Sequence, residues 1–172
     1  MRSSIFAGLA LIIALAGAPA AGAHTSAVGT FQTLTAGSDL GLEIEGIAKL
    51  KRTHDRTLAK LVVRGLEPGT TYAAHLHNAP CSAANPGGGH YKDDPDGPSV
   101  PPNELWLSST DDPLAGITAN AAGVARGRGS ADWVARPDAQ AIVIHHIPPG
   151  GTTAGGPKIA CADLVRPHSD DD

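Results

Sequence analysis

The sequence is divided into short apolar runs, rich in β-branched residues, that are separated by clusters of glycine, proline, asparagine and aspartate. Such runs are typical of β-strands and the clusters are typical of turns, and no stretch shows sustained helical periodicity. The pattern predicts an all-β chain that forms an antiparallel sandwich or barrel. We expect strands at residues 27–35, 41–50, 57–63, 71–77, 105–108, 117–131, 141–145 and 158–164, with a bend at Gly123 or Gly127, and long Gly/Pro-rich loops at 81–103 and 147–157.

The two ends of the chain differ from this pattern. The start has the positive charge of Arg2, a short apolar stretch and the small residues Ala21-Gly22-Ala23, which together predict a secretory signal peptide over residues 1–23. The alternative to a signal peptide is a membrane anchor. A membrane span needs about 20 residues, and this apolar stretch is shorter. We therefore expect a secreted or periplasmic protein without a transmembrane segment after processing. One domain would span residues 24–166, and residues 167–172 would form a disordered acidic tail.

Charge and cysteine content give evidence about the partners of the chain and about a disulfide. The formal net charge is −4 and there is no basic run, so nothing in the sequence indicates a nucleic-acid partner. The only two cysteines are Cys81 and Cys161. In an exported chain an even count predicts a disulfide, the alternative being two free thiols.

Histidines carry the clearest chemical signal. In the run YAAHLH, alternation along a strand places His75 and His77 on one face and Leu76 on the other, in the core. A His-x-His pair is a chelating arrangement, although such pairs also occur on wet surfaces. His90 follows a flexible run of three glycines, and His145 ends the apolar run AIVIH, so these four imidazoles could converge.

The composition of this set indicates the metal. Imidazoles without thiolate or carboxylate favour Cu(II), although zinc is also bound by imidazole. Three other histidines are weaker candidates for ligands. His54 lies in a charged turn, His146 should face the opposite side of the strand from His145, and His168 lies in the tail. Cleavage after Ala23 would make His24 the first residue, and a terminal amine with its own imidazole is an alternative copper site.

Four segments of the chain resemble the copper/zinc superoxide dismutases. They are GLEPGTTYAAHLHNAPCS, GGGHY, AIVIHH and GGPKIACADL, and they occur in the family's order. The resemblance implies an eight-stranded Greek-key β-barrel, a Cys81–Cys161 disulfide, and dismutation of superoxide to oxygen and hydrogen peroxide. It also implies one copper held by His75, His77, His90 and His145, with His90 leaving the metal and taking up a proton on reduction.

Three departures from the family pattern change these expectations. No histidine lies between His90 and His145, and Glu104 in NEL takes the place of an aspartate, so a four-ligand zinc site is not expected. The loop after His145 is short. Lys158 stands where the family has arginine, and we expect it to attract superoxide but to orient it less well. The pattern resembles the copper-only branch of the family.

Without zinc, His90 needs another group to orient it. Carboxylates commonly bind the outer nitrogen of a metal-bound histidine, and Glu104 is the first candidate. Asp93, Asp94 and Asp96 are alternatives, although KDDPDG is also typical of a solvated turn. Two other functions stay open: a copper storage or delivery protein on the same barrel, and a structural β-sandwich with vestigial histidines. The sequence leaves the oligomeric state open.

Overall fold

The computed structural model describes residues 25–166, and the expected signal peptide, His24 and the acidic tail lie outside the described residues. It contains eight strands and little helix. The strands are β1 (Thr25–Thr33), β2 (Glu45–Arg52), β3 (Thr57–Arg64), β4 (Thr71–His77), β5 (Ile117–Thr118), β6 (Ala125–Ala131), β7 (Ala141–His146) and β8 (Lys158–Asp163), and the helices are α1 (Thr35–Asp39) and the 3-10 turn η1 (Pro113–Ala115).

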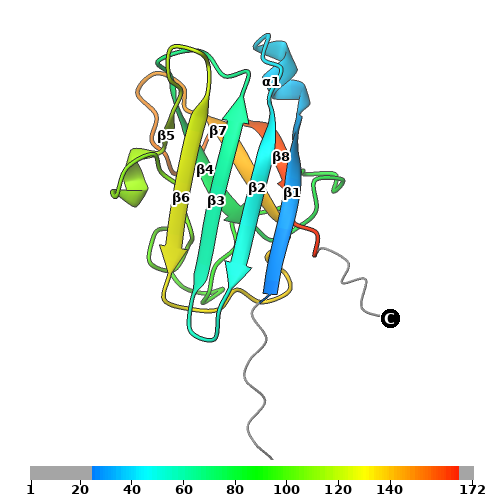
Figure 1. Cartoon of the computed structure of the whole chain (residues 1–172), viewed down its shortest axis with the longest axis vertical. Coiled ribbons are helices and arrows are strands. Elements are labelled where there is room, and N and C mark those ends of the chain that lie inside the picture. The colour runs from blue at the N-terminus through cyan, green and yellow to red at the C-terminus, as the bar shows by residue number, and fades with distance from the viewer. Residues whose placement is uncertain (1–24, 167–172) are drawn as a thin grey trace, which may run out of the picture.

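All strands join one antiparallel sheet in the order β5-β4-β7-β8-β1-β2-β3-β6. The sheet curls into a nearly closed barrel, in which β1, β2, β3 and β6 form one layer and β4, β5, β7 and β8 the other (Figure 1). Near the remaining gap, a bridge between Ser108 and Arg128 joins a loop to β6. Three pairs of neighbouring strands in the sheet are not consecutive in the sequence: β3–β6, β4–β7 and β8–β1. The predicted all-β Greek-key barrel is confirmed.

The first two strands are shifted from their predicted bounds, to Thr25–Thr33 and Glu45–Arg52, and two other regions differ in kind. Residues 117–131 are two strands rather than one, because a turn closed by a hydrogen bond from Gly123 N to Asn120 O separates β5 from β6. Residues 105–108 form isolated bridges, including His75 with Trp106, instead of a strand. The short helix α1 was not predicted, because its five residues are too few to show a helical period.

The core lies between the two layers and follows the alternation of the strands. In β3, Thr57, Ala59, Leu61 and Val63 are buried, whereas Lys60, Val62 and Arg64 are exposed. β4 and β7 are buried on both faces, since one face packs in the barrel core and loops cover the other. This second, covered face carries the histidines.

The disulfide is confirmed. Cys81 and Cys161 are joined, with 80 residues of sequence separation, and no cysteine is free. The bond attaches the loop after β4 to β8. A disulfide fits a chain that folds outside a reducing compartment. Among residues 25–166, no helix has the length and apolar character that crossing a membrane requires.

Candidate metal centre

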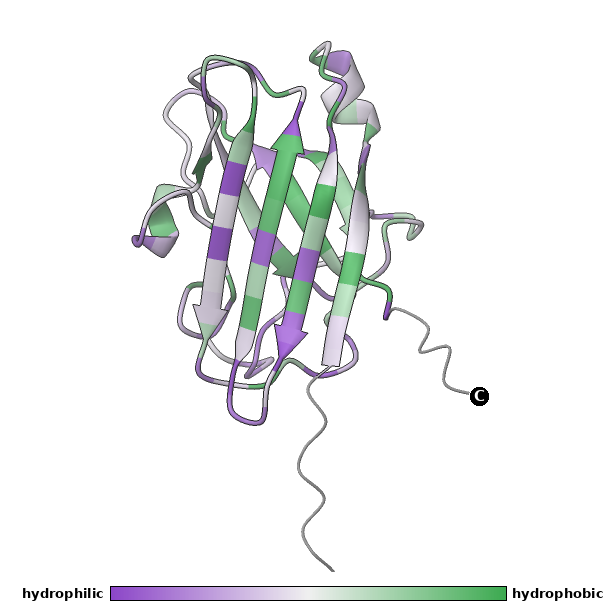
Figure 2. Ribbon diagram, in the orientation of Figure 1, coloured by the Kyte–Doolittle hydropathy of each residue, from purple (hydrophilic) through white to green (hydrophobic). Residues whose placement is uncertain are grey.

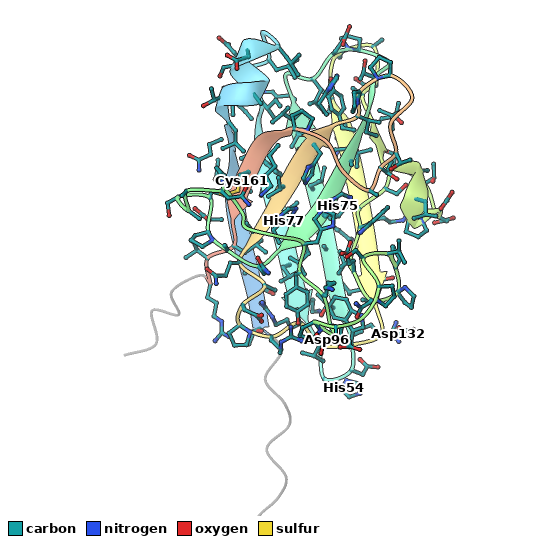
Figure 3. The ribbon with its side chains drawn as sticks, turned by 180° about the vertical axis from the view of Figure 1, so that it is seen from behind. His54, His75, His77, Asp96, Asp132 and Cys161 are labelled. Carbon is teal, nitrogen blue, oxygen red and sulfur yellow. A yellow bond between two sulfur atoms is a disulfide. The ribbon has the colours of Figure 1, made fainter. Side chains whose placement is uncertain are left out.

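The structure brings together the four histidines named above. One ligand nitrogen from each of His75, His77, His90 and His145 lies within 4.8 Å of the others. His75 and His77 come from alternate positions of β4 (Figure 3). His145 lies on the neighbouring β7. His90 comes from the loop and forms a bridge with His77. Leu76 points the other way and is fully buried, as alternation predicted.

The glycine run allows the loop to approach the cluster. Gly87 has a φ of +75°, which favours glycine, and a Cβ there would lie 2.5 Å from Val143 Cγ2 and 3.3 Å from His77 Nδ1. The backbone therefore passes directly over the His77 ring. This close approach brings the loop, and with it His90, back to the face of β4.

The outer nitrogens of three imidazoles are occupied by acceptors. His75 Nε2 donates to Thr153 O at 2.7 Å, and His145 Nδ1 donates to Gly156 O at 2.9 Å. His90 Nδ1 donates to Glu104 Oε2 at 2.8 Å. Because the protons sit on these outer nitrogens, the inner nitrogens His75 Nδ1, His90 Nε2 and His145 Nε2 carry lone pairs.

Two buried imidazole nitrogens of the cluster have no hydrogen-bond partner. His75 Nδ1 is buried with no hydrogen-bond partner. His77 Nε2 lies 3.1 Å from His145 Nε2 and donates to its lone pair, which leaves His77 Nδ1 buried without a partner. A cation placed among these atoms would satisfy them together, so the residues fit a metal ion. An imidazole-only set suits copper or zinc, and the geometry does not distinguish the two.

Electrostatics keep the cluster in the form that binds metal. Burial above all lowers the pKa of His145 to about 4; the hydrogen bond to Gly156 O opposes this shift, and the neighbouring His90 and Lys158 contribute to it. Burial, followed by the neighbouring imidazoles, holds the pKa values of His75 and His77 well below the ordinary histidine range. These three imidazoles are therefore neutral at neutral pH, as ligands must be.

Glu104 is a buried carboxylate beside the cluster. Its side chain is 1% exposed, and Oε2 accepts a second hydrogen bond from Trp106 Nε1 at 2.6 Å. The Trp106 ring also packs against His75, with ring centroids 4.6 Å apart. Sequence reasoning missed Trp106. The signal was its place two residues after Glu104, since alternate residues of an extended segment lie on one side.

The other acids and histidines lie elsewhere. Asp94 Oδ1 caps its own turn by accepting from Asp96 N, and Asp93 lies 3.9 Å from Arg136 Nη1. His54 is an exposed residue 3.4 Å from Asp55. His146 is near Tyr72, with ring centroids 6.3 Å apart, rather than in the cluster.

Lys158 is held by the glycine-rich loop. Its Nζ donates to Asn85 Oδ1 at 2.7 Å, to Pro86 O at 2.8 Å and to Gly88 O. The three ammonium protons are thus all directed at the loop. The charge is still close enough to the cluster to lower the pKa of His77 and His145.

The four-histidine cluster and its barrel define a candidate metal-binding β-barrel protein. Comparison of the sequence with protein-family models and with curated proteins gives no match. Any proposal of a family therefore rests on the sequence motifs.

Proposed function

We propose that this protein is an exported, copper-dependent superoxide dismutase of the copper-only type. The observation that carries the proposal is the convergence of four imidazole nitrogens within 4.8 Å, with three outer nitrogens held by fixed acceptors. The order of the four sequence motifs supports the family. Imidazoles suit both copper and zinc, and the absence of thiolate and carboxylate ligands is the reason to propose copper.

Each histidine has a distinct task in this proposal. His75, His77 and His145 would hold one copper ion in both of its oxidation states, with His90 as a fourth ligand of Cu(II), and the ion when bound supplies one-electron oxidation and reduction. His90 is the least buried of the four, and when it is off the metal its Nε2 could hold a proton while Glu104 fixes the ring. In the balanced reaction, one superoxide loses an electron to become oxygen, and a second gains an electron and two protons to become hydrogen peroxide.

Zinc is not required in this proposal. Where a second metal would orient the outer nitrogen of His90, the Glu104 carboxylate already accepts from that nitrogen. Glu104 in turn is held by Trp106. Glu104 and the Nδ1 of His90 are thus matched to each other, and the metal-ligand group found among residues 25–166 contains only the four histidines named above.

The first prediction is that the mature protein binds one copper and no stoichiometric zinc after reconstitution with both metals. Metal analysis and the rate of superoxide decay would be measured together. His77→Ala should lose the copper and the activity, whereas His54→Ala, which alters an exposed histidine, should behave as wild type. One zinc bound beside one copper would contradict the proposal.

The alternative is a copper storage or delivery protein on the same barrel. It is favoured by the engagement of all three Lys158 protons with loop oxygens, which leaves this charge poorly placed to orient an anion. One bound copper with no superoxide decay would select this alternative. Failure to bind copper tightly would mean that the cluster is not a copper site.

Lys158 gives a second prediction. Lys158→Met should slow superoxide decay about tenfold and weaken its dependence on ionic strength, because the charge that attracts the anion is removed. Lys158→Arg should keep the salt dependence. Lys92→Met removes a lysine whose Nζ donates to Gly97 O, farther along the same loop, and serves as the control. Equal rates and equal salt dependence for Lys158→Met and wild type would limit Lys158 to fastening the loop.

A further inference from the structure

The outer face of the β1-β2-β3-β6 layer is strongly basic. Six of the chain's 13 lysines and arginines point outward from β2, β3 and β6, although the chain as a whole carries a net charge of −4. Hydrophilic bands cross β2, β3 and β6 in Figure 2. We call this surface the basic face, and its cations are Lys49, Lys51, Lys60, Arg64, Arg126 and Arg128.

The cations of the basic face are placed against one another. Lys60 is the direct register partner of Lys49 on one side and of Arg128 on the other, so three positive charges form a row across three strands. Like charges in directly opposite positions destabilise a sheet. Folding alone therefore gives no reason for this row, and an anionic partner would explain it.

Few acids neutralise the basic face. Glu45 pairs with Arg64, and Asp111 reaches Arg128 from a loop at the edge. Within residues 25–166, no ion pair involves Lys49, Lys51, Lys60 or Arg126. The basic face therefore keeps most of its charge available to a partner.

An apolar centre distinguishes this surface from a purely charged one. Ile47 and Val62 are register partners at the middle of the sheet and are 49% and 41% exposed. They line a groove together with Lys49, Lys60 and Arg64, and with Glu45, the partner of Arg64. Cations around exposed aliphatic side chains match a lipid surface, in which anionic headgroups lie above acyl chains.

We propose that the basic face docks the protein on an anionic phospholipid surface. The charges contact headgroup phosphates while Ile47 and Val62 reach the layer beneath them. The histidine cluster lies on the opposite layer, on the covered face of β4 and β7 (Figures 1 and 3). Docking in this orientation leaves the metal centre facing away from the membrane, toward the surrounding medium.

The test measures co-sedimentation of the full mature protein with vesicles of equal parts phosphatidylglycerol and phosphatidylcholine. We expect binding at low salt that falls as salt rises, and little binding to pure phosphatidylcholine. Lys60→Glu should weaken binding more than tenfold, because it exchanges two units of charge at the centre of the basic face. This variant should fold, since the new carboxylate lies opposite Lys49 and Arg128.

The control is the double variant Ser38→Glu/Ser82→Glu, which adds the same negative charge at exposed positions of α1 and the Cys81 loop. It should bind nearly as well as wild type. Equal loss in the control, or no binding of wild type to anionic vesicles, would overturn the proposal. Binding to dextran sulfate without vesicle binding would replace the lipid with a soluble polyanion. Dimerisation that Lys60→Glu abolishes, without vesicle binding, would assign the basic face to a second copy of this chain.

Discussion

Replacing both Cys81 and Cys161 by alanine is expected to lower the free energy of unfolding by about 4–5 kcal/mol. The reason is the length of the closed loop: with 80 residues between the cysteines, the crosslink removes much of the conformational freedom of the unfolded chain. Alanine is preferable to serine, because both positions are buried with Ala141 and Val143 and a hydroxyl there would lack a partner.

The measurement is chemical denaturation of the double variant and of wild type, each metal-free, with and without a reducing agent. Reduced wild type should unfold at nearly the same denaturant concentration as the variant. A loss below about 1 kcal/mol would show that the loop-closure account of the bond is wrong.

The same bond is expected to affect the metal centre. Cys81 lies between His77 and His90 in the loop whose Gly87 packs on Val143 and His77. The variant should therefore bind copper more weakly even under conditions in which it is folded. The hydrogen bond that Cys81 N donates to Asp163 Oδ1, at 2.7 Å, also joins the loop to β8 and does not need the sulfur, so it limits this effect.

Much of the barrel could be predicted because strands have a period that side chains reveal. His75 and His77 on one face, with Leu76 opposite, follow from that period alone. His90 and Glu104 lie 2.8 Å apart but come from irregular segments, so only resemblance to a family suggested the pair. No pattern of side chains encodes the backbone acceptors Thr153 O and Gly156 O, because any residue supplies the same carbonyl.

The basic face shows a different limit of sequence reasoning. Its cations are scattered along three strands, and no two are adjacent in the sequence, so a search for a basic run does not find them. Only the register of β2, β3 and β6 places Lys49, Lys60 and Arg128 in one row. The net negative charge of the chain therefore gives no indication of the positive charge on the basic face.

Glu104→Gln is expected to weaken Cu(II) binding and slow superoxide decay by roughly 10–100-fold. The amide keeps the size of the side chain and one acceptor oxygen, so the hydrogen bonds from His90 Nδ1 and Trp106 Nε1 can persist. What is lost is the negative charge, which strengthens both bonds and raises the basicity of the His90 ring. The amide nitrogen would also occupy the place of Oε1, which is buried without a partner.

The control is Asp94→Asn, which makes the same chemical change in the exposed turn of residues 93–97 and should leave both quantities unchanged. Unfolding curves of the metal-free variants would show whether the fold is intact. The Cu(II) electron paramagnetic resonance spectrum gives a third readout, since altered orientation of His90 changes the ligand field whereas a general loss of stability does not. If Glu104→Gln matches wild type in all three measurements, the carboxylate merely fills a buried position. If Asp94→Asn is impaired instead, the orienting carboxylate lies in that turn.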